Sequence, residues 1–409
     1  MNWKNWYKET TLANGMKLWY RHFKTQTSAI YALIGAGGSC DGAHPGIAHL
    51  TEHMLFRGTK NMPEDAMKYR AAKYGIKIGA STGKELMTFV AENILDVEIA
   101  LDIVYEALTS PLFPETGLSK EKPTVVSEIK RGEDDNAYRA MKIAMARMVK
   151  YPFNVPNLGF AETLETITTQ HLHDFHSALF TPDNITLCYA GALKIDEIVE
   201  LCNENFGCWQ PVKAQWSGSY TMPEMPSLTV NRRDQEQTHA SLNFPGVAED
   251  NEDYEKVDLL CSIIGGSLVG RMFAELRNEK GLCYNCGIRT PSFSSTPGVI
   301  SFYGATPKKN TTKFISGVLE IINALLSGQK PITQDELDSA KARYNATLFN
   351  ASDNLNSQLA LFITTWKSHR TLHERIKLIN ALTINNLNDV ARKYLSMEPQ
   401  IIIIGEQSA

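Results

Sequence analysis

Residues 46–59 read Gly-Ile-Ala-His-Leu-Thr-Glu-His-Met-Leu-Phe-Arg-Gly-Thr and contain the pattern His-x-x-Glu-His. Apolar residues flank this triplet and a glycine stands at each end, which predicts a short helix packed into a domain. On that helix His49 and His53 are four residues apart, so both imidazoles leave the same face and can bind one metal ion. Glu52 lies on that side too, where its carboxylate can reach a metal-bound water without being a ligand. The alternative interpretation is a solvated helix face, because three fixed residues can meet at this spacing by chance.

A third ligand must come from elsewhere, because a catalytic zinc needs three protein ligands and one open position. The segment 118–130 contains Glu121 and Glu128, which are seven residues apart and therefore share a face of a predicted helix. Glu128 lies inside the apolar run 125–129, an awkward place for an unpaired carboxylate, and it can complete a His/His/Glu set. Glu121, two turns away, can steady a ligand or the water. The alternative is an amphipathic helix with its acids in solvent.

Both segments resemble signature sequences of the pitrilysin family of inverted-motif zinc metallopeptidases. The resemblance rests on Gly-x-Ala-His-x-x-Glu-His-Met-x-Phe-x-Gly-Thr at 46–59 and on Glu-x-x-x-Val-Val-x-Glu-Ile at 121–129. Looser family-like segments follow in the family's order at 159–167 and 180–191. The resemblance runs over nearly the whole chain, and it is greatest to the short prokaryotic relatives of mitochondrial processing peptidase.

The resemblance implies one Zn²⁺ per chain, held by His49, His53 and Glu128. It implies that Glu52 activates the zinc-bound water as a general base, and that Glu121 supports catalysis from outside the ligand set. The implied activity is that of an endopeptidase that hydrolyses peptides or unfolded segments in a closed chamber. Two alternatives stay open: a non-catalytic peptide-binding or partner subunit of a heterodimeric peptidase, and a dedicated peptide maturase.

The second half of the chain has no His-x-x-Glu-His, but residues 265–284 end in a segment similar to the family signature Arg-x-x-x-Gly-Leu-x-Tyr. In relatives this arginine and tyrosine steady the substrate carbonyl as negative charge develops. By resemblance Arg277 and Tyr284 take these roles. From the residues alone, the interpretation would be a surface arginine and a core tyrosine.

Residues 77–82 and 86–91 predict a hairpin. In relatives the first of these strands is an exposed edge that pairs with the substrate backbone. The family usually has Asn-Ala-x-Thr there, and in this chain a glycine replaces the asparagine, so one side-chain contact with the substrate backbone is missing. The expected substrate-binding residues are Gly79, Ala80 and Ser81. The alternative is an ordinary edge strand that contains a glycine.

An internal repeat and the length of 409 residues predict more than one domain. Residues 167–175 recur as 382–390, each followed by an apolar strand, which indicates a duplicated domain. The predicted organisation is an N-terminal metal-binding peptidase domain, a proline-containing linker, and a C-terminal domain that carries the Arg/Tyr signature without a metal motif, over residues 1–210, 211–226 and 227–409.

The predicted fold class is α+β, with two similar domains that each have a mainly antiparallel sheet covered by helices. By resemblance the chain forms half of a clamshell chamber, because long relatives carry four such domains. A homodimer is therefore expected, in which a second copy supplies Arg277 and Tyr284 to each zinc site. A heterodimer with a related two-domain chain is the alternative.

The composition excludes several classes of partner. A hydrophobic content of 43% with 21% charged residues is that of a globular protein. A net charge of −4 offers no general attraction to nucleic acid or to an anionic membrane, so neither partner is expected. The N-terminus lacks an apolar signal core and no apolar run is long enough to span a bilayer, which predicts a cytoplasmic protein.

Other local patterns are interpreted as structural. The glycines at 35–39 resemble a phosphate loop, but no Gly-Lys-Ser/Thr follows them. Seven scattered cysteines suit reduced thiols, and Cys283 and Cys286 are expected to serve packing. Three histidines of a predicted helix are expected to be mostly surface residues and not ligands, at positions 171, 173 and 176. Residues 16–23 and 28–34 are predicted to form paired strands, and 115–150 to be largely helical.

Overall fold

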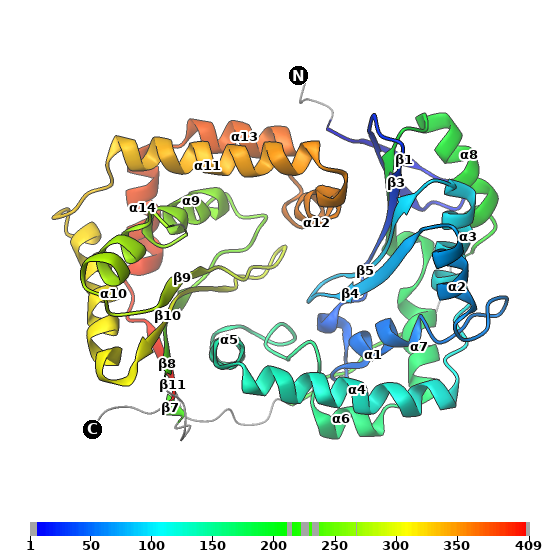
Figure 1. Cartoon of the computed structure of the whole chain (residues 1–409), viewed down its shortest axis with the longest axis horizontal. Helices are drawn as coiled ribbons and strands as arrows, with labels where there is room; N and C mark the ends of the chain where they lie inside the picture. Colours follow the sequence, from blue (N-terminus) through cyan, green and yellow to red (C-terminus); the bar gives the residue numbers. More distant parts are fainter. Residues whose placement is uncertain (1–5, 211–214, 222–228, 231–236, 267, 406–409) are drawn as a thin grey trace. The chain divides into compact units, whose positions relative to one another are not determined.

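The computed structural model describes residues 6–210, 215–221, 229–230, 237–266 and 268–405. It divides into two compact units, which we describe separately (Figure 1). Unit 1 comprises Met1–Arg131, Tyr151–Met222 and Ala351–Ile363, and unit 2 comprises Gly132–Lys150, Pro223–Asn350 and Thr364–Ala409. Each unit combines one sheet with several helices, so the predicted α+β class is confirmed.

Unit 1 is built on a six-stranded sheet in the order β1-β2-β6-β3-β5-β4. Its strands are β1 (Lys8–Thr11), β2 (Lys17–His22), β3 (Ser28–Ile34), β4 (Lys77–Thr82), β5 (Met87–Ile94) and β6 (Ile185–Gly191). Only β2 and β6 are parallel neighbours, and all other neighbours are antiparallel. The central strands β3 and β6 are buried along their whole length. The hairpin of β4 and β5 places β4 at an edge of the sheet, as predicted.

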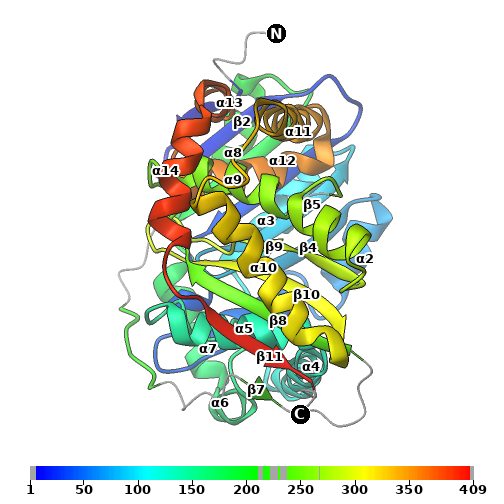
Figure 2. The same ribbon diagram turned by 90° about the vertical axis from the view of Figure 1, so that its left-hand side faces the viewer.

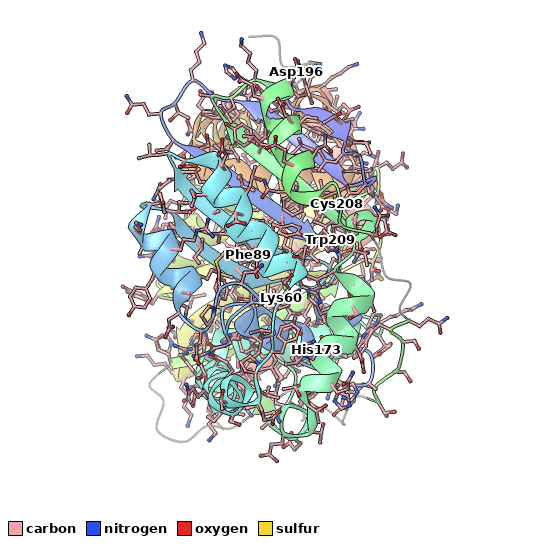
Figure 3. All side chains as sticks on the ribbon, turned by 90° about the vertical axis from the view of Figure 1, so that its right-hand side faces the viewer. Lys60, Phe89, His173, Asp196, Cys208 and Trp209 are labelled. Atoms are coloured by element: carbon pink, nitrogen blue, oxygen red, sulfur yellow. The ribbon has the colours of Figure 1, made fainter. Side chains whose placement is uncertain are left out.

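The helices of unit 1 cover this sheet. They are α1 (Ile47–Met54), α2 (Ala66–Lys73), α3 (Val97–Thr109), α4 (Glu115–Asp134), α6 (Ala161–Thr166), α7 (Thr169–Leu179) and α8 (Ile195–Phe206). Helix α3 packs against β3, β5 and α8, while α1 packs against α7 and β4. Figure 3 views this helical side of the unit, with Phe89 of β5 labelled. Short helical turns occur at η2 (Gly38–Cys40) and η3 (Pro182–Asn184).

Unit 2 has a five-stranded sheet in the order β7-β11-β8-β10-β9. Its strands are β7 (Thr229–Val230), β8 (Gln237–Pro245), β9 (Asn285–Arg289), β10 (Val299–Pro307) and β11 (Gln400–Ile404). Helices α10 and α14 pack on this sheet, and α9 packs on α14 (Figure 2). The helices are α5 (Asn136–Met148), α9 (Tyr254–Ile264), the π-helix η4 (Phe273–Glu279), η5 (Lys308–Asn310), α10 (Thr311–Leu326), α11 (Gln334–Asp353), α13 (Leu372–Ala381) and α14 (Ile384–Leu395).

The two sheets have the same topology, which confirms the predicted duplicated fold. Strand for strand, β2-β6-β3-β5-β4 corresponds to β7-β11-β8-β10-β9, and the single parallel pair falls at the same place in both. The repeated sequence maps onto the equivalent helices α7 and α14. Thr168 caps the first by accepting from the His171 backbone N–H, and Thr383 caps the second by accepting from Asn386.

Each unit also contains a segment from the other half of the sequence. Helix α5 packs against β8, β10 and β11 of unit 2, where Ala140 and Ile143 share a core cluster with Ile402. Conversely, η6 (Leu355–Ser357) and the start of α12 (Gln358–Ser368) belong to unit 1, where the Phe362 ring lies 5.0 Å from the Trp6 ring. The predicted domain ranges 1–210 and 227–409 are contiguous, so they do not include these two exchanged segments.

One local prediction is wrong and another is confirmed. The strands at 16–23 and 28–34 do not pair with each other, because β6 lies between β2 and β3 and buries its apolar residues against both. The prediction that 115–150 is largely helical is confirmed by α4 and α5. The two helices meet at Asp135, whose carboxylate caps α5 by accepting from the Ala137 and Tyr138 backbone N–H groups. Among the described residues, none of the helices combines the length and the apolar character that crossing a lipid bilayer requires.

Candidate metal centre

Helix α1 holds the paired histidines, and its start is fixed by Asp41. The carboxylate of Asp41 accepts hydrogen bonds from the backbone N–H groups of Gly46 at 2.6 Å and Ala48 at 3.1 Å. Gly46 has a φ of +94°, and a Cβ there would lie 2.7 Å from the carbonyl oxygen of Leu158, so only glycine fits. These contacts fix the position and direction of the first turn of α1, which follows the loop after β3.

The structure brings His49, His53 and Glu128 together, with one ligand atom of each within 4.8 Å of the others. The Nε2 atoms of His49 and His53 lie 3.0 and 3.8 Å from the same Glu128 oxygen, Oε2. Tetrahedral zinc with bonds of about 2.1 Å places its ligand atoms roughly 3.4 Å apart. The two observed distances lie on either side of that value, so the residues fit the ion.

Glu121 approaches the other side of His53. Its Oε2 lies 2.7 Å from His53 Nδ1, and its Oε1 accepts a hydrogen bond from Arg57 Nε at 2.6 Å. Burial alone would raise the pKa of Glu121, but the hydrogen bonds from His53 and Arg57 outweigh burial and lower this pKa below its ordinary value. The ionised carboxylate therefore keeps the proton on Nδ1 and leaves the Nε2 lone pair of His53 turned toward Glu128.

Glu52 lies beside the three candidate ligands. Its Oε2 accepts a hydrogen bond from the Thr82 hydroxyl at 2.7 Å and lies 3.3 Å from His49 Nδ1. Burial acts to raise the pKa of Glu52, but the hydrogen bonds from His49 and Thr82 outweigh it and lower the pKa. For His49, burial acts to lower the pKa, and the bonds with Glu52 and Glu128 outweigh burial and raise it.

The charges of this cluster also fit a cation. Three carboxylates, those of Glu52, Glu121 and Glu128, converge on two imidazoles. Arg57 pairs with Glu121, and the exposed Arg131 lies 3.8 Å from Glu128 Oε1. Arg57 is shared with Glu64, whose Oε1 accepts from Nη1 at 2.7 Å. The cluster thus has an excess of negative charge that a divalent cation would balance.

The expected substrate-binding residues lie on β4, which among the described strands pairs with β5 alone. Gly79 and Ala80 are partly exposed, and Ser81 is exposed with its hydroxyl 2.8 Å from that of Thr88. A Cβ at Gly79 would meet only a Val90 methyl, at 3.5 Å, and the backbone there is not left-handed. Neither space nor backbone conformation therefore requires glycine at this position.

Arg277 and Tyr284 lie together in unit 2, whereas the metal cluster lies in unit 1. The Arg277 guanidinium lies 5.6 Å from the Tyr284 ring centre and 4.5 Å from that of Phe273. Tyr284 is 74% exposed, so the interpretation as a core residue is wrong. Arg277 stands in a π-helix, a rare conformation that is frequent at functional sites and that sequence periodicity does not reveal.

Three functional contacts were missed by sequence reasoning. Asp41 caps the metal-binding helix, Arg57 orients Glu121, and Thr82 holds Glu52. Arg57 lies three residues beyond the end of α1, in the turn that follows the helix, so helical spacing could not have placed it. The other two depend on how the chain folds back on itself.

The remaining histidines and cysteines form no second centre. Within the described residues, His49, His53 and Glu128 are the only group of three or more potential ligands close enough to share an ion. His173 is exposed, as predicted (Figure 3). His176 differs from the prediction, because burial lowers its pKa to about 4 and its Nε2 lies 2.9 Å from the Leu108 carbonyl oxygen. Cys283 and Cys286 are buried in the core of unit 2.

Two family models match the chain. The model described as "Insulinase (Peptidase family M16)" covers residues 18–154, and that described as "Peptidase M16 inactive domain" covers residues 166–344. The chain is 27% identical to "Uncharacterized zinc protease YmxG" of Bacillus subtilis, over 97% of this chain and 98% of the relative. It is 26% identical to "Uncharacterized zinc protease Rv2782c" of Mycobacterium tuberculosis, over 97% of this chain and 93% of the relative.

Solved structures share the fold. A protease from Helicobacter pylori superposes with a TM-score of 0.88 at 19% identity, covering 97% of this chain and 98% of that one. A "peptidase M16 inactive domain" structure from Pseudomonas fluorescens superposes with a TM-score of 0.85 at 20% identity, covering 98% of both chains.

Proposed function

Because the chain belongs to the M16, pitrilysin-like peptidase family, we propose that it is a zinc-dependent endopeptidase. The observation that carries the proposal is the convergence of His49, His53 and Glu128, with Glu52 held beside them and outside the ligand set. Many zinc peptidases likewise combine three protein ligands with a separate carboxylate that is not a ligand.

The ligand set would be His49 Nε2, His53 Nε2 and Glu128 Oε2, with Glu121 fixing the His53 ring. Zn²⁺ bound there would polarise the scissile carbonyl and make a water molecule acidic enough, with a pKa of roughly 7, to react near neutral pH. Glu52 would take a proton from the water as the water oxygen bonds to the carbonyl carbon, and would pass that proton to the leaving amine as the carbon–nitrogen bond breaks. The low pKa of Glu52 keeps it ionised and able to accept.

The proposed substrates are peptides or unfolded polypeptide segments. Strand β4 is the feature that supports this class, because it ends the sheet and its backbone has a partner on one side only. An extended peptide can add to such an edge through main-chain hydrogen bonds, and folded proteins rarely offer a free strand. Gly79, Ala80 and Ser81 would contact the peptide mainly through their backbone.

The proposal includes a second chain. Arg277 and Tyr284 form a donor pair in unit 2, and we infer a homodimer in which each pair serves the metal centre of the other copy. A heterodimer with a related two-domain chain would use the same contacts. Mixing an inactive Glu52→Gln chain with an inactive Tyr284→Phe chain should restore part of the activity as subunits exchange. No recovery after demonstrated exchange would contradict shared sites.

A non-catalytic peptide-binding subunit is the second candidate function. It is favoured by the match of residues 166–344 to an inactive-domain model. Gly79 in place of the usual asparagine instead favours the narrow substrate range of a maturase. A dedicated maturase for one peptide is a narrower form of the first proposal.

Zinc content and cleavage of a mixed peptide pool separate these functions. The endopeptidase should hold about one zinc per chain, cleave many peptides internally, lose activity with a chelator and regain it with zinc. A maturase would cleave very few members of the pool. Peptide binding without cleavage by the zinc-loaded protein would instead establish the non-catalytic function.

A further inference from the structure

We propose that Thr82 is a positioning residue that anchors Glu52 through Oε2, so that Oε1 is the oxygen that receives the proton. This inference rests on the proposed peptidase function and adds a residue and an atom to it. It also links the base to the edge strand, because Thr82 is the last residue of β4.

The contacts of the two Glu52 oxygens are unequal. Oε2 accepts the Thr82 hydroxyl at 2.7 Å, a length typical of a strong hydrogen bond to an ionised carboxylate, and it lies 3.3 Å from His49 Nδ1. No hydrogen bond reaches Oε1 from any residue that the structure describes. The side chain is 12% exposed, so it is confined and still open to a small molecule.

An anchor matters for this side chain because the terminal torsion of a glutamate is broad and roughly two-fold. Without Thr82, the carboxylate of Glu52 could turn about that torsion and exchange its two oxygens. A donor on Oε2 removes this freedom and lowers the basicity of the oxygen that it binds. Oε1 is then both the freer and the more basic atom, and correct orientation of a base contributes directly to rate.

Thr82 is itself held firmly. Its carbonyl oxygen accepts from Asn157 Nδ2 at 3.4 Å, and the hairpin turn that follows is bonded to the loop before α1. In that loop the Gly38 N–H donates to the Gly83 carbonyl at 3.0 Å, and the Ser39 N–H donates to the Lys84 carbonyl at 2.7 Å. The strand end, the turn and the helix that carries Glu52 are therefore tied together. A peptide added to β4 would lie in a fixed register with respect to Oε1.

The hairpin also provides a matched control. Thr88 of β5 is buried, and its hydroxyl bonds to that of Ser81 at 2.8 Å. Replacing Thr88 by valine removes a buried hydroxyl–hydroxyl bond from the same hairpin and leaves the Thr82–Glu52 bond in place. A general loss of hairpin stability would thus affect Thr88→Val as well as Thr82→Val.

The experiment compares Thr82→Val, Thr82→Ser and Thr88→Val with the unaltered protein. We expect Thr82→Val to lower kcat about 10- to 100-fold with KM changed by less than about twofold and zinc content unchanged. Thr82→Ser should restore most of kcat, and Thr88→Val should retain it. Crystal structures of the zinc-free proteins give a second measure, in which Glu52 should turn away from its original orientation in Thr82→Val and not in Thr82→Ser.

Several results would overturn the inference: unchanged kcat in Thr82→Val, an equal loss in Thr88→Val, loss of zinc in Thr82→Val, or an unmoved Glu52 in its crystal structure. Absence of cleavage by the zinc-loaded unaltered protein is a different result, because it refutes the proposed peptidase function. In that case the crystal structures alone still decide whether Thr82 positions Glu52.

Discussion

The two units share one sheet topology but differ in how their buried acidic side chains are paired with positive charge. In unit 1 the helix after the central strand β3 is α1, and in unit 2 the helix after β8 is α9; each packs against the equivalent helix α7 or α14. Both helices carry buried or partly buried acids. On α9, Glu255 is matched by arginines, with Arg370 Nη1 at 3.3 Å and Arg375 Nε at 3.6 Å.

On α1 the balance is incomplete. Glu52 and the neighbouring Glu128 face imidazoles, and the nearby Arg57 is engaged by Glu121 and Glu64. A buried carboxylate without a full cationic partner is costly, and the folded chain keeps it only where the surroundings hold it in place. Burial raises the pKa of Asp258, also on α9, to about 6, so the matching in unit 2 concerns Glu255. The comparison teaches that the same scaffold pairs a buried glutamate with arginines in unit 2 and supports an ion site in unit 1.

The largest effect is expected from Glu52→Gln. Cleavage should fall about 100- to 10,000-fold while zinc stays bound, because the change removes the base and none of the ligands. The zinc-free variant should unfold at a lower urea concentration than the unaltered zinc-free protein, because the hydrogen bonds from His49 and Thr82 that lower the pKa of Glu52 stabilise its ionised form in the folded state. Glu128→Gln is the contrasting control, because it should lose zinc. Retained cleavage by Glu52→Gln would refute its assignment as the base.

A loss of stability without a loss of zinc is expected in unit 2. Arg375→Gln should destabilise the protein by about 3–5 kcal/mol, because it leaves the buried Glu255 with less positive charge. Zinc content per folded chain should not change. Urea unfolding measures the effect, with Arg392→Gln as the control: Arg392 pairs with Asp389 at 3.2 Å on the surface, and its loss should change stability by less than about 1 kcal/mol. If Arg375→Gln loses no more stability than Arg392→Gln, the proposed difference between the two units is refuted.

A smaller effect is expected from Glu121→Gln. Zinc affinity should fall about 10- to 100-fold, because His53 loses the ionised acceptor that fixes its ring, while all three ligands remain. Competition with a chelator measures the affinity. Glu64→Gln is the matched control, since Glu64 contacts Arg57 and none of the histidines. Equal zinc affinities in the two variants would remove Glu121 from the site.

The smallest effect is expected from Gly79→Asn on β4. KM for peptides should fall about two- to tenfold, since an added amide can donate a hydrogen bond to an extended substrate, and folding stability should stay the same because the site has room. Gly46→Ala is the contrasting change, which should destabilise the protein because of the positive φ and the nearby Leu158 carbonyl. An unchanged or higher KM in Gly79→Asn would argue against peptide pairing with this strand.

Much of the site could be predicted because helices repeat every 3.6 residues. That period places His49 beside His53 and Glu121 on the face of Glu128, whatever the rest of the chain does. The duplicated domain was equally visible, because the repeat at 167–175 and 382–390 reflects two equivalent helices. The hairpin followed from the residues, and the position of its first strand at a sheet edge followed from the family resemblance.

Other features could not be predicted from local patterns. The insertion of β6 between β2 and β3 joins residues more than 150 positions apart, as in the pairing of Leu18 with Leu187. The partial burial of His176 and the exposure of Tyr284 depend on what packs against them. The two exchanged segments likewise follow from long-range packing.

By itself, the sequence determined which residues carry the chemistry: two histidines and a glutamate at helical spacing, and a pair of glutamates two turns apart. Only the tertiary structure decided how these residues are oriented. Glu121 contacts His53, Thr82 donates a hydrogen bond to Glu52, and Asp41 caps the start of α1. The physical reason is that spacing along a helix is set by local backbone geometry. The partner of a polar side chain is set by which distant segments fold against it and exclude water.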